Sequence, residues 1–326
     1  MSVTNQPAVS VILPNYNHAR FLPDRLNSIL NQTFSQFELI LLDDCSTDHS
    51  RQILSEVSDP RITHRIFNTE NSGSPFAQWN RGVQLARAPL IWIAESDDLC
   101  DATFLEKLVP YFDGHPDLAL VYCQSAIIDS NGSVAGSQLG WTADFGSDRW
   151  NTGFVADGSA EISQYLLRKS TIPNASAVVF RRDLFPSDLA FSRFRQTGDT
   201  LIWCLIIAGK QLRFLPDSLN LHRHHQETVR AGTSRSRRLI DIIRLSLELE
   251  RRLGLTRSDR NELIIRIDSL AGDMEKERVF PNYFFPLLLS VLPHVLRQPY
   301  FHTVGLVLKT FIRFFKFRIQ SRLGIR

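Results

Sequence analysis

The segments VSVILPNYN (residues 9–17) and FELILLDDCSTD (residues 37–48) share one pattern, in which a continuous apolar run ends at a cluster of polar residues. The segment LIWIAESDD (residues 90–98) repeats this pattern. Such apolar runs, separated by segments with helical spacing, predict a parallel β-sheet that helices cover on both faces. In these sheets ligands bind beyond the carboxyl ends of the strands, so we expect the polar clusters to form a binding site.

The rest of the α/β pattern follows from the spacing of apolar residues. We expect helices at residues 21–30, 46–57, 74–86, 103–112, 200–208 and 239–253. We expect further strands at residues 61–67, 118–122, 126–128, 175–180, 212–215 and 219–224. The intervening segment 130–158 is rich in Gly, Ser, Asp and Asn, and its length favours a functional lid or mobile loop.

The composition is that of an ordinary globular protein. The chain has 326 residues, of which 43% are hydrophobic and 22% charged, which permits a sizeable core. A net charge of +3 is too small to indicate nucleic-acid binding, so we expect no nucleic-acid partner. The four cysteines form no C-x-x-C pair and the N-terminus shows no signal peptide, so we expect free thiols in a cytoplasmic protein.

Sequence motifs argue against several other enzyme classes. The chain contains no G-x-x-x-x-G-K-[ST] loop, so a P-loop kinase is not supported. No G-x-G-x-x-G follows the first predicted strand, which argues against a dinucleotide-dependent oxidoreductase. No G-x-S-x-G elbow indicates a hydrolase of the α/β type.

Glu95, Asp97 and Asp98 place three carboxylates within four residues at the end of a predicted strand. Oxygen ligands in this number favour a site for Mg²⁺ or Mn²⁺ that keeps room for water and diphosphate oxygens. The alternative interpretation is an acidic helix N-terminus, where carboxylates interact favourably with the helix dipole. Three acids exceed what a helix terminus needs, so the cation site is the favoured hypothesis.

Four segments between Val9 and Thr228 resemble, in order, the motifs of family-2 glycosyltransferases. They are PNYN (residues 14–17), DDCSTD (43–48), ESDD (95–98) and GD (198–199). The resemblance implies a GT-A fold, in which a nucleotide-binding α/β sheet is flanked by helices. It also implies inverting transfer from a UDP-, GDP- or dTDP-linked sugar, assisted by Mg²⁺ or Mn²⁺.

The resemblance assigns roles to individual residues. Asp44 is expected to accept a hydrogen bond from a ring N–H of the donor base, and Asp98 to bind the metal directly. Asp199 is expected to deprotonate the acceptor hydroxyl. The residues expected to bind the donor or its diphosphate are Pro14, Tyr16, Asn17, Asp44, Arg81, Asp97, Arg223 and His225. A plain surface position on a helix is the alternative interpretation for Arg81.

Two differences from the family keep alternative functions open. Glu95 stands where the family usually has Asp, and Gly198 stands where it usually has Glu. These differences allow a nucleotide-sugar-binding protein of the same fold without catalysis. A nucleotidyltransferase of related fold would need a Gly- and Arg/Lys-rich phosphate loop early in the chain, and none follows Leu13.

Three regions are expected along the chain: residues 1–100 as the nucleotide-sugar-binding half, 101–232 as the acceptor-binding half, and 233–326 as a helical, basic, amphipathic extension. Apolar and basic residues recur at helical spacing between Gly305 and Gln320, and no acid follows Val279. This pattern favours an anionic membrane surface over packing on the catalytic domain. We therefore expect a peripheral protein at the inner face of the plasma membrane, with a sugar or lipid-linked sugar as acceptor.

Overall fold

The computed structural model describes residues 6–266, apart from 147, 189–193, 195, 226–234 and 264. At its centre the described residues form a ten-stranded sheet of order β3-β2-β1-β4-β9-β6-β10-β5, with β7 paired to β6 and β8 to β10. The strands are β1 (Val9–Asn15), β2 (Phe37–Asp43), β3 (Ile62–Phe67), β4 (Leu90–Ile93), β5 (Leu99–Cys100), β6 (Leu118–Ile128), β7 (Val134–Ser137), β8 (Phe154–Asp157), β9 (Val178–Arg181) and β10 (Gln211–Arg223).

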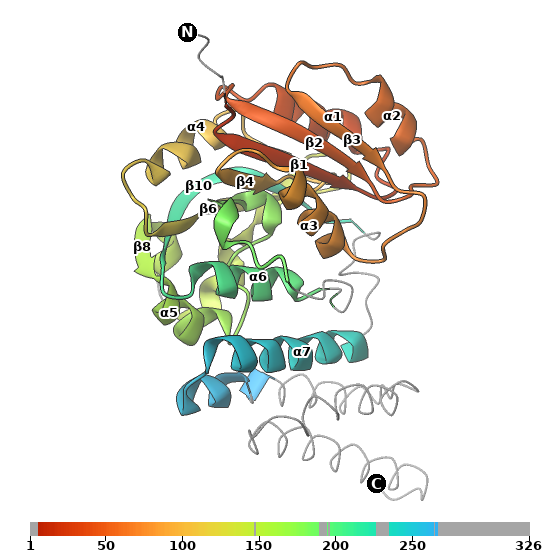
Figure 1. Cartoon of the computed structure of the whole chain (residues 1–326). Coiled ribbons are helices and arrows are strands. Elements are labelled where there is room, and N and C mark those ends of the chain that lie inside the picture. The colour runs from red at the N-terminus through yellow and green to blue at the C-terminus, as the bar shows by residue number, and fades with distance from the viewer. Residues whose placement is uncertain are drawn as a thin grey trace, which may run out of the picture.

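Helices flank this sheet, and the long helix α7 runs along the side of α6 that faces away from the sheet (Figure 1). The α-helices are α1 (Leu22–Leu30), α2 (Ser50–Glu56), α3 (Pro75–Leu85), α4 (Phe104–Leu108), α5 (Gly158–Glu161), α6 (Gly198–Ile207) and α7 (Arg235–Leu253). A π-helical turn, η4 (Ile162–Leu166), follows α5. Short 3₁₀ segments are η1 (Val109–Phe112), η2 (Gln138–Phe145), η3 (Arg149–Asn151), η5 (Ala175–Ala177) and η6 (Arg182–Leu184).

Each face of the sheet has its own hydrophobic core, because side chains alternate between the two faces along a strand. On β1, Val11 belongs to the core shared with α1 and α4, where Trp92 and Phe104 stack with ring centroids 4.6 Å apart. Its neighbour Ile12 belongs to the opposite core, which α3, α6 and α7 complete around the fully buried Trp203. Burial on both faces fixes the strands, and with them the polar residues at their carboxyl ends.

The parallel arrangement expected from the sequence holds for only part of the sheet. β1 pairs in parallel with β2 and β4, and β2 pairs in parallel with β3. β9 then lies antiparallel between β4 and β6. A buried strand is apolar on both faces whichever way it runs, so the sequence pattern does not reveal its direction.

Two pairs of short strands expected from the sequence are single long strands. Residues 118–122 and 126–128 both belong to β6, and residues 212–215 and 219–223 both belong to β10. The register of β10 against β6 shifts between Leu215 and Asn220. Pro216 and the two polar residues after it lie in this irregular part and interrupt the apolar pattern, which is why the sequence suggested two strands.

The segment 130–158, expected as a lid or mobile loop, contains the regular elements β7, η2, η3 and β8. Trp150 in this segment is only 3% exposed and donates a hydrogen bond from Nε1 to the hydroxyl of Tyr122, at 3.2 Å. The segment is therefore partly built into the core. Its 3₁₀ segments have three residues per turn, so they do not show the 3.6-residue period that predicts an α-helix.

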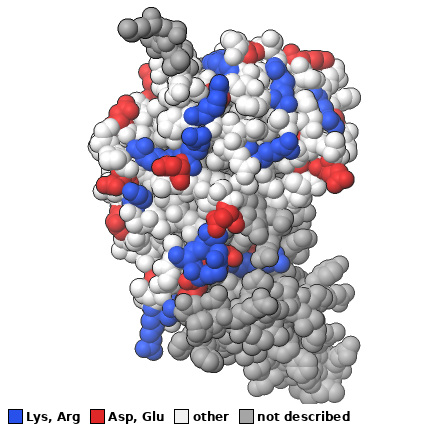
Figure 2. Space-filling model, viewed as in Figure 1, with Lys and Arg blue, Asp and Glu red and all other residues white. Residues whose placement is uncertain are grey.

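The described surface carries charges of both signs, and Figure 2 shows Lys and Arg interspersed with Asp and Glu on one face. All four cysteines are free, as expected, and three of them are buried. Among the described helices, none combines the length and apolar character required to cross a bilayer. The amphipathic segment expected between Gly305 and Gln320 lies outside the described residues.

We predict that Gly158→Ala destabilises the fold. A Cβ atom at Gly158 would lie 1.8 Å from the carbonyl oxygen of Ile207, so α5 would have to move away from the end of α6. Overpacking of this kind costs roughly 1–3 kcal/mol, which urea or thermal unfolding measures. Gly140→Ala is the control, because Gly140 is exposed and has no atom within 4 Å of an added Cβ. Equal unfolding midpoints for the two variants would contradict the prediction.

Candidate active site

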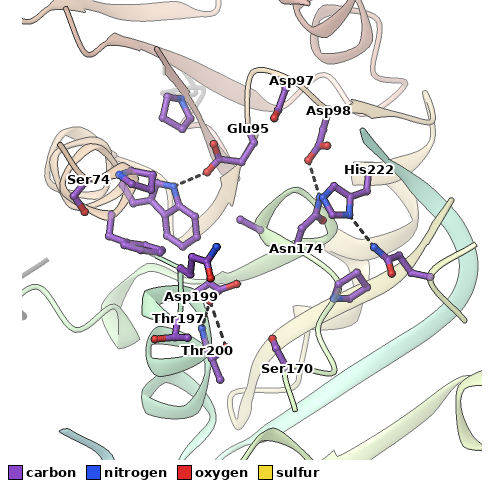
Figure 3. Close-up of a pocket in the computed structure, with 18 of the residues that line it drawn as sticks. Ser74, Glu95, Asp97, Asp98, Ser170, Asn174, Thr197, Asp199, Thr200 and His222 are labelled. Carbon is purple, nitrogen blue, oxygen red and sulfur yellow. Dashed lines mark hydrogen bonds between the residues drawn. The ribbon is translucent and has the colours of Figure 1, made fainter. Parts of the chain in front are cut away.

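The carboxyl ends of β1, β2 and β4 border a cavity of about 790 Å³, which the N-terminal turn of α6 also lines (Figure 3). All four sequence motifs therefore contribute to one pocket. The expected site residues that line it are Pro14, Tyr16, Asp44, Asp97, Asp98 and Asp199. The expected donor residues Asn17, Arg81, Arg223 and His225 are not part of the lining.

Asn17 connects the turns that follow β1 and β2. Its backbone N–H donates to the Ser46 hydroxyl at 2.9 Å, and its side-chain oxygen accepts from the Thr47 N–H at 2.7 Å. These contacts hold its backbone at a φ of 56°, a left-handed conformation that Asn tolerates. Tyr16, next to it, is 46% exposed and lines the cavity, so its ring is accessible to a ligand.

Asp44 is buried and held by several donors at the end of β2. Its Oδ1 accepts hydrogen bonds from Asn68, from the backbone N–H of Ser72 and from Gln78, at 2.7–2.9 Å. Its Oδ2 accepts from the Ser72 hydroxyl at 2.7 Å. Oδ2 therefore keeps acceptor capacity for one ligand donor, which suits the expected role in base recognition. Asn68 and Gln78 were not expected from the sequence, because they follow β3 and lie on α3, away from the motif that contains Asp44.

Arg81 reaches the site only indirectly. Its guanidinium donates to the side-chain oxygen of Asn68, which in turn donates to Asp44. Arg81 therefore supports Asn68, which in turn holds Asp44.

Glu95 lies half-buried in the cavity and accepts a hydrogen bond from Trp79 Nε1 at 2.7 Å (Figure 3). Burial, assisted by the nearby charge of Asp97, raises the pKa of Glu95 to about 8. Glu95 is therefore mostly neutral at pH 7, so the three acids of the ESDD motif need not carry three negative charges. The side chain of Glu95 is one methylene longer than that of the Asp usual in the family. Its Oε1 accepts the hydrogen bond from Trp79.

Asp97 belongs to a group that can hold a metal ion. The ligand atoms of His18, Asp97 and His225 all lie within 4.8 Å of one another. Burial alone would raise the pKa of Asp97, but the hydrogen bond with His225 (3.1 Å) and the charges of both histidines lower it. The His18 ring is oriented by a 2.8 Å hydrogen bond between its Nδ1 and the hydroxyl of Ser96. His225, although outside the cavity lining, is thus brought to the site through Asp97.

Asp98 has a different environment from Asp97. It is 2% exposed, its Oδ1 accepts from the backbone N–H of Arg223 at 2.9 Å, and its Oδ2 accepts from Asn174 at 2.7 Å. Asp98 is not a member of the metal-competent group found among the described residues. The group that can hold a metal ion therefore contains Asp97 and not Asp98, and the role of Asp98 as a direct metal ligand stays a prediction.

Two buried arginines act on the acidic turn, Arg223 through hydrogen bonds and Arg25 through its charge. Arg223 donates from Nε to the backbone oxygen of Asp97 at 2.7 Å, and from Nη1 to that of Asp129 at 2.8 Å. Arg25, on α1, is fully buried against the Trp92 ring, with its guanidinium carbon 5.1 Å from the ring centroid. Burial raises the pKa of Glu95 and of Asp98, and the charge of Arg25 opposes this rise at both.

The sequence analysis missed Arg25, although a signal was present. Arg25 lies three residues after Leu22 and four before Ile29, so helical spacing places it on the buried face of α1. A charged residue on a buried helix face requires a compensating charge nearby. This requirement predicts that carboxylates lie near Arg25.

Asp199 lies in the first turn of α6, on the same cavity as the acidic turn after β4 (Figure 3). Its Oδ1 accepts from the backbone N–H of Thr200 at 2.6 Å. Burial raises the pKa of Asp199 to about 6, which suits a group that must take up a proton near neutral pH. The N-cap residue Thr197 makes no side-chain cap hydrogen bond, so the bond from the Thr200 N–H also gives Asp199 a part in stabilising the first turn of α6.

The unusual Gly198 has a steric cause. A Cβ atom at this position would lie 2.6 Å from the ring of Phe76, which is 4% exposed in the core. A larger side chain such as the family's Glu would displace the Phe76 ring. This difference from the family therefore reflects local packing, and it leaves Asp199 on the cavity.

The far part of the cavity is lined by residues that the sequence analysis did not select. They come from η2, from the segment after η4, and from the C-terminal part of the described chain: Trp141, Asp144, Phe145, Arg168, Lys169, Ser170, Ile242, Glu262, Ile265 and Arg266. Lys169 lies 4.1 Å from the centroid of the Trp141 ring and pairs with Asp144 at 3.0 Å. Aromatic rings beside paired charges suit a polar, ring-shaped ligand such as a sugar.

The sheet, with its ligand-binding edge and its acidic turn, defines a class, the α/β transferases of the GT-A type. The model of Glycosyl transferase family 2 matches residues 10–185, more than half of the chain, and the chain belongs to this family. The expected family is thereby confirmed, and the matched residues include the PNYN, DDCSTD and ESDD motifs but not Gly198 and Asp199.

Relatives of the chain include enzymes of polysaccharide synthesis. A glycosyltransferase of Nostoc sp., itself uncharacterized, is 29% identical over 232 residues, which cover 67% of this chain and 65% of that protein. The chondroitin synthase of Escherichia coli is 32% identical over 137 residues, 41% of this chain and 20% of that enzyme. The chain thus spans less than two thirds of the length of these relatives.

Solved structures share the fold. Staphylococcus aureus TarS 1–349 in complex with UDP superposes with a TM-score of 0.62 at 17% identity, over 97% of this chain and 91% of that chain. The mannosyltransferase PcManGT of Pyrobaculum calidifontis, in complex with GDP-Man and Mn²⁺, gives a TM-score of 0.53 at 17% identity, over 95% and 87% of the two chains. These likenesses confirm the expected GT-A sheet flanked by helices.

We predict that Asp98→Asn lowers the stability of the fold in the absence of any metal. Both oxygens of Asp98 accept hydrogen bonds in a buried position, and the variant places an NH₂ group against one of the two donors. An unsatisfied buried group costs about 1–3 kcal/mol, measurable by thermal unfolding in EDTA. Asp144→Asn, on an exposed carboxylate, should unfold like the wild type. An Asp98→Asn midpoint equal to that of the wild type would argue against the structural role.

Proposed function

We propose that this chain transfers a sugar from a nucleoside diphosphate to a hydroxyl acceptor, with inversion at the transferred carbon. The observation that carries the proposal is the lining of one cavity by three carboxylates from different motifs: Asp44, Asp97 and Asp199. They provide, in turn, a base-recognition group, a cation ligand and a proton acceptor. Family membership supports the reaction class.

The nucleoside end of the donor would lie against Tyr16 and Asp44. An ionised carboxylate accepts hydrogen bonds and donates none. Asp44 therefore selects bases with a ring N–H, such as uracil, thymine or guanine. The exposed ring of Tyr16 offers a stacking surface beside it. The fold is shared with proteins solved with UDP and with GDP-Man, which is consistent with either base.

The side chains around Asp97 fit a divalent cation. One carboxylate and two imidazole nitrogens favour Mn²⁺ over Mg²⁺, because Mg²⁺ prefers oxygen ligands alone. A bound cation would neutralise the charge that develops on the departing nucleoside diphosphate. His18, Asp97 and His225 would hold it, while Arg223 fixes the backbone of the turn and Ser96 orients the His18 ring.

Asp199 would act as the general base. Its Oδ1 is held by the N–H of Thr200, so Oδ2 is the atom that takes the proton from the acceptor hydroxyl. The acceptor oxygen forms a bond to the anomeric carbon as the bond from that carbon to the diphosphate oxygen breaks. A single displacement of this kind inverts the configuration. Trp141 and the charged residues around it would bind the acceptor.

The membrane part of the proposal rests on sequence alone. Residues 305–320 combine apolar and basic side chains without any acid, a composition that suits an anionic bilayer surface. We propose that this segment brings the enzyme to a lipid-linked acceptor at the cytoplasmic face of the membrane. Relatives named for polysaccharide synthesis are consistent with such an acceptor.

The first prediction concerns the metal. Mn²⁺ alone should raise the thermal unfolding midpoint of the wild type, because a ligand that binds only the folded state stabilises it. Asp97→Asn should lose this shift together with Mn²⁺-dependent release of nucleotide from a sugar nucleotide. Asp144→Asn, which alters another cavity carboxylate, should keep the Mn²⁺ shift. If Asp97→Asn keeps the full shift and Asp98→Asn loses it, Asp98 is the ligand after all.

The second prediction concerns the base. Since burial raises the pKa of Asp199 to about 6, Asp199 is protonated and inactive at lower pH and becomes ionised as the pH rises. The rate of sugar transfer should therefore rise with pH and lose its dependence on this group above pH 7. Asp199→Asn should reduce kcat by about 10²–10⁴-fold and abolish the rise of the rate with pH. The affinity for UDP, measured by calorimetry, should be unchanged. A rise with pH that persists in Asp199→Asn would show that another group is the base.

A further inference from the structure

Helix α7 belongs to the predicted C-terminal extension, yet it packs directly against α6, the helix that carries Asp199 (Figure 1). Its buried face is mainly apolar, with Leu245 and Leu249 fully buried. Asp241 on the same helix is only 1% exposed. A buried carboxylate in such a position is costly unless donors satisfy it, so its partners are informative.

Asp241 binds the two residues that lead into α6. Its carboxylate oxygen Oδ2 accepts from the backbone N–H of Gln196 at 2.8 Å, and its backbone oxygen accepts from the hydroxyl of Thr197 at 3.1 Å. Both partners line the cavity that also contains Asp199. Arg244 lies 3.9 Å from the carboxylate and balances its charge.

We infer that Asp241 is a positioning residue for the catalytic base: α7 uses it to fix the chain that enters α6, and thereby the place of Asp199 in the cavity. This inference rests on the proposed role of Asp199. Thr197 is the cap residue of α6, and its carbonyl accepts the Leu201 N–H at 3.2 Å. A shift at Gln196 or Thr197 therefore moves the first helical turn, which contains Asp199.

The size of the expected effect follows from the geometry of proton transfer. A base must lie within hydrogen-bonding distance of the acceptor hydroxyl, and a misplacement of about 1 Å can cost on the order of 10²-fold in rate. A hydrogen bond to a carboxylate is also stronger and shorter than one between neutral groups. The contact of Asp241 with a backbone N–H fixes the chain whatever side chain stands at position 196. The residue after Asp241, Ile242, itself lines the cavity, so the same turn of α7 is part of the cavity wall.

The experiment compares Asp241→Ala with Glu250→Ala in the full-length chain. Glu250 lies on the same helix, nine residues after Asp241, is 4% exposed and pairs with Arg260. It therefore controls for the loss of a buried charge on α7. Nucleotide release is measured with UDP-glucose, UDP-N-acetylglucosamine and GDP-mannose in Mn²⁺, and the donor that the wild type turns over fastest is used. UDP or GDP affinity is measured by calorimetry.

Asp241→Ala should lower kcat by about tenfold or more, with nucleotide affinity within about twofold of wild type. Glu250→Ala should keep the wild-type kcat even where its unfolding midpoint falls. Asp241→Asn should recover most of the activity, because an amide oxygen can accept the same bond from Gln196. If Asp241→Ala does not fold, Thr197→Val provides the test: it removes the hydroxyl that donates to the backbone oxygen of Asp241, the second contact between α7 and the start of α6, and should also lower kcat.

A double-mutant comparison separates positioning from general weakening of the fold. Adding Asp241→Ala to Asp199→Asn should change kcat little, because a missing base cannot be misplaced. An additive loss, or equal losses in Asp241→Ala and Glu250→Ala, would overturn the inference. A wild type that neither binds nor turns over any of the nucleotides would instead overturn the proposed function.

Discussion

The packing of strands and helices around the cavity depends on how three acids within four residues, Glu95, Asp97 and Asp98, are accommodated in a half-buried turn after β4. Burial raises the pKa of Glu95 to about 8, so that residue is largely protonated at neutral pH. Asp97 is paired with His225, and Asp98 accepts hydrogen bonds from a backbone N–H and from Asn174. Glu95 is thus compensated by protonation, whereas the partners of Asp97 and Asp98 come from the end of β10 and from Asn174. The cluster therefore fixes several elements at once.

The topology of the sheet makes this compensation possible. β10 pairs antiparallel with the short strand β5 just after the acidic turn, with Asn220 opposite Cys100. This pairing brings Arg223 and His225, more than 120 residues away in sequence, to the backbone and side chain of Asp97. From the other side, α1 carries the buried Arg25 towards the same acids. The part of the sheet in which parallel and antiparallel pairs alternate, formed by β9, β6, β10 and β5, therefore brings residues of β10 to the acidic turn after β4.

Sequence patterns predicted the elements of the donor half because buried strands and amphipathic helices have distinct periods. The polar residues at strand ends, Asp44 and the ESDD turn, could be placed for the same reason. The different surroundings of Asp97 and Asp98 could not be predicted, since adjacent carboxylates differ only in the direction of their side chains. The cavity wall formed by Ile242, Glu262 and Arg266 was also missed, because contacts across such sequence separations leave no local pattern.

The same wall has a consequence for the order of events during protein synthesis. Every site residue expected from the sequence precedes residue 226, whereas the lining of the pocket extends to Arg266. A nascent chain emerges from the ribosome with its N-terminal part first. The pocket is therefore completed late in translation, when the segment that contains Arg266 has left the ribosome and can dock beside α6.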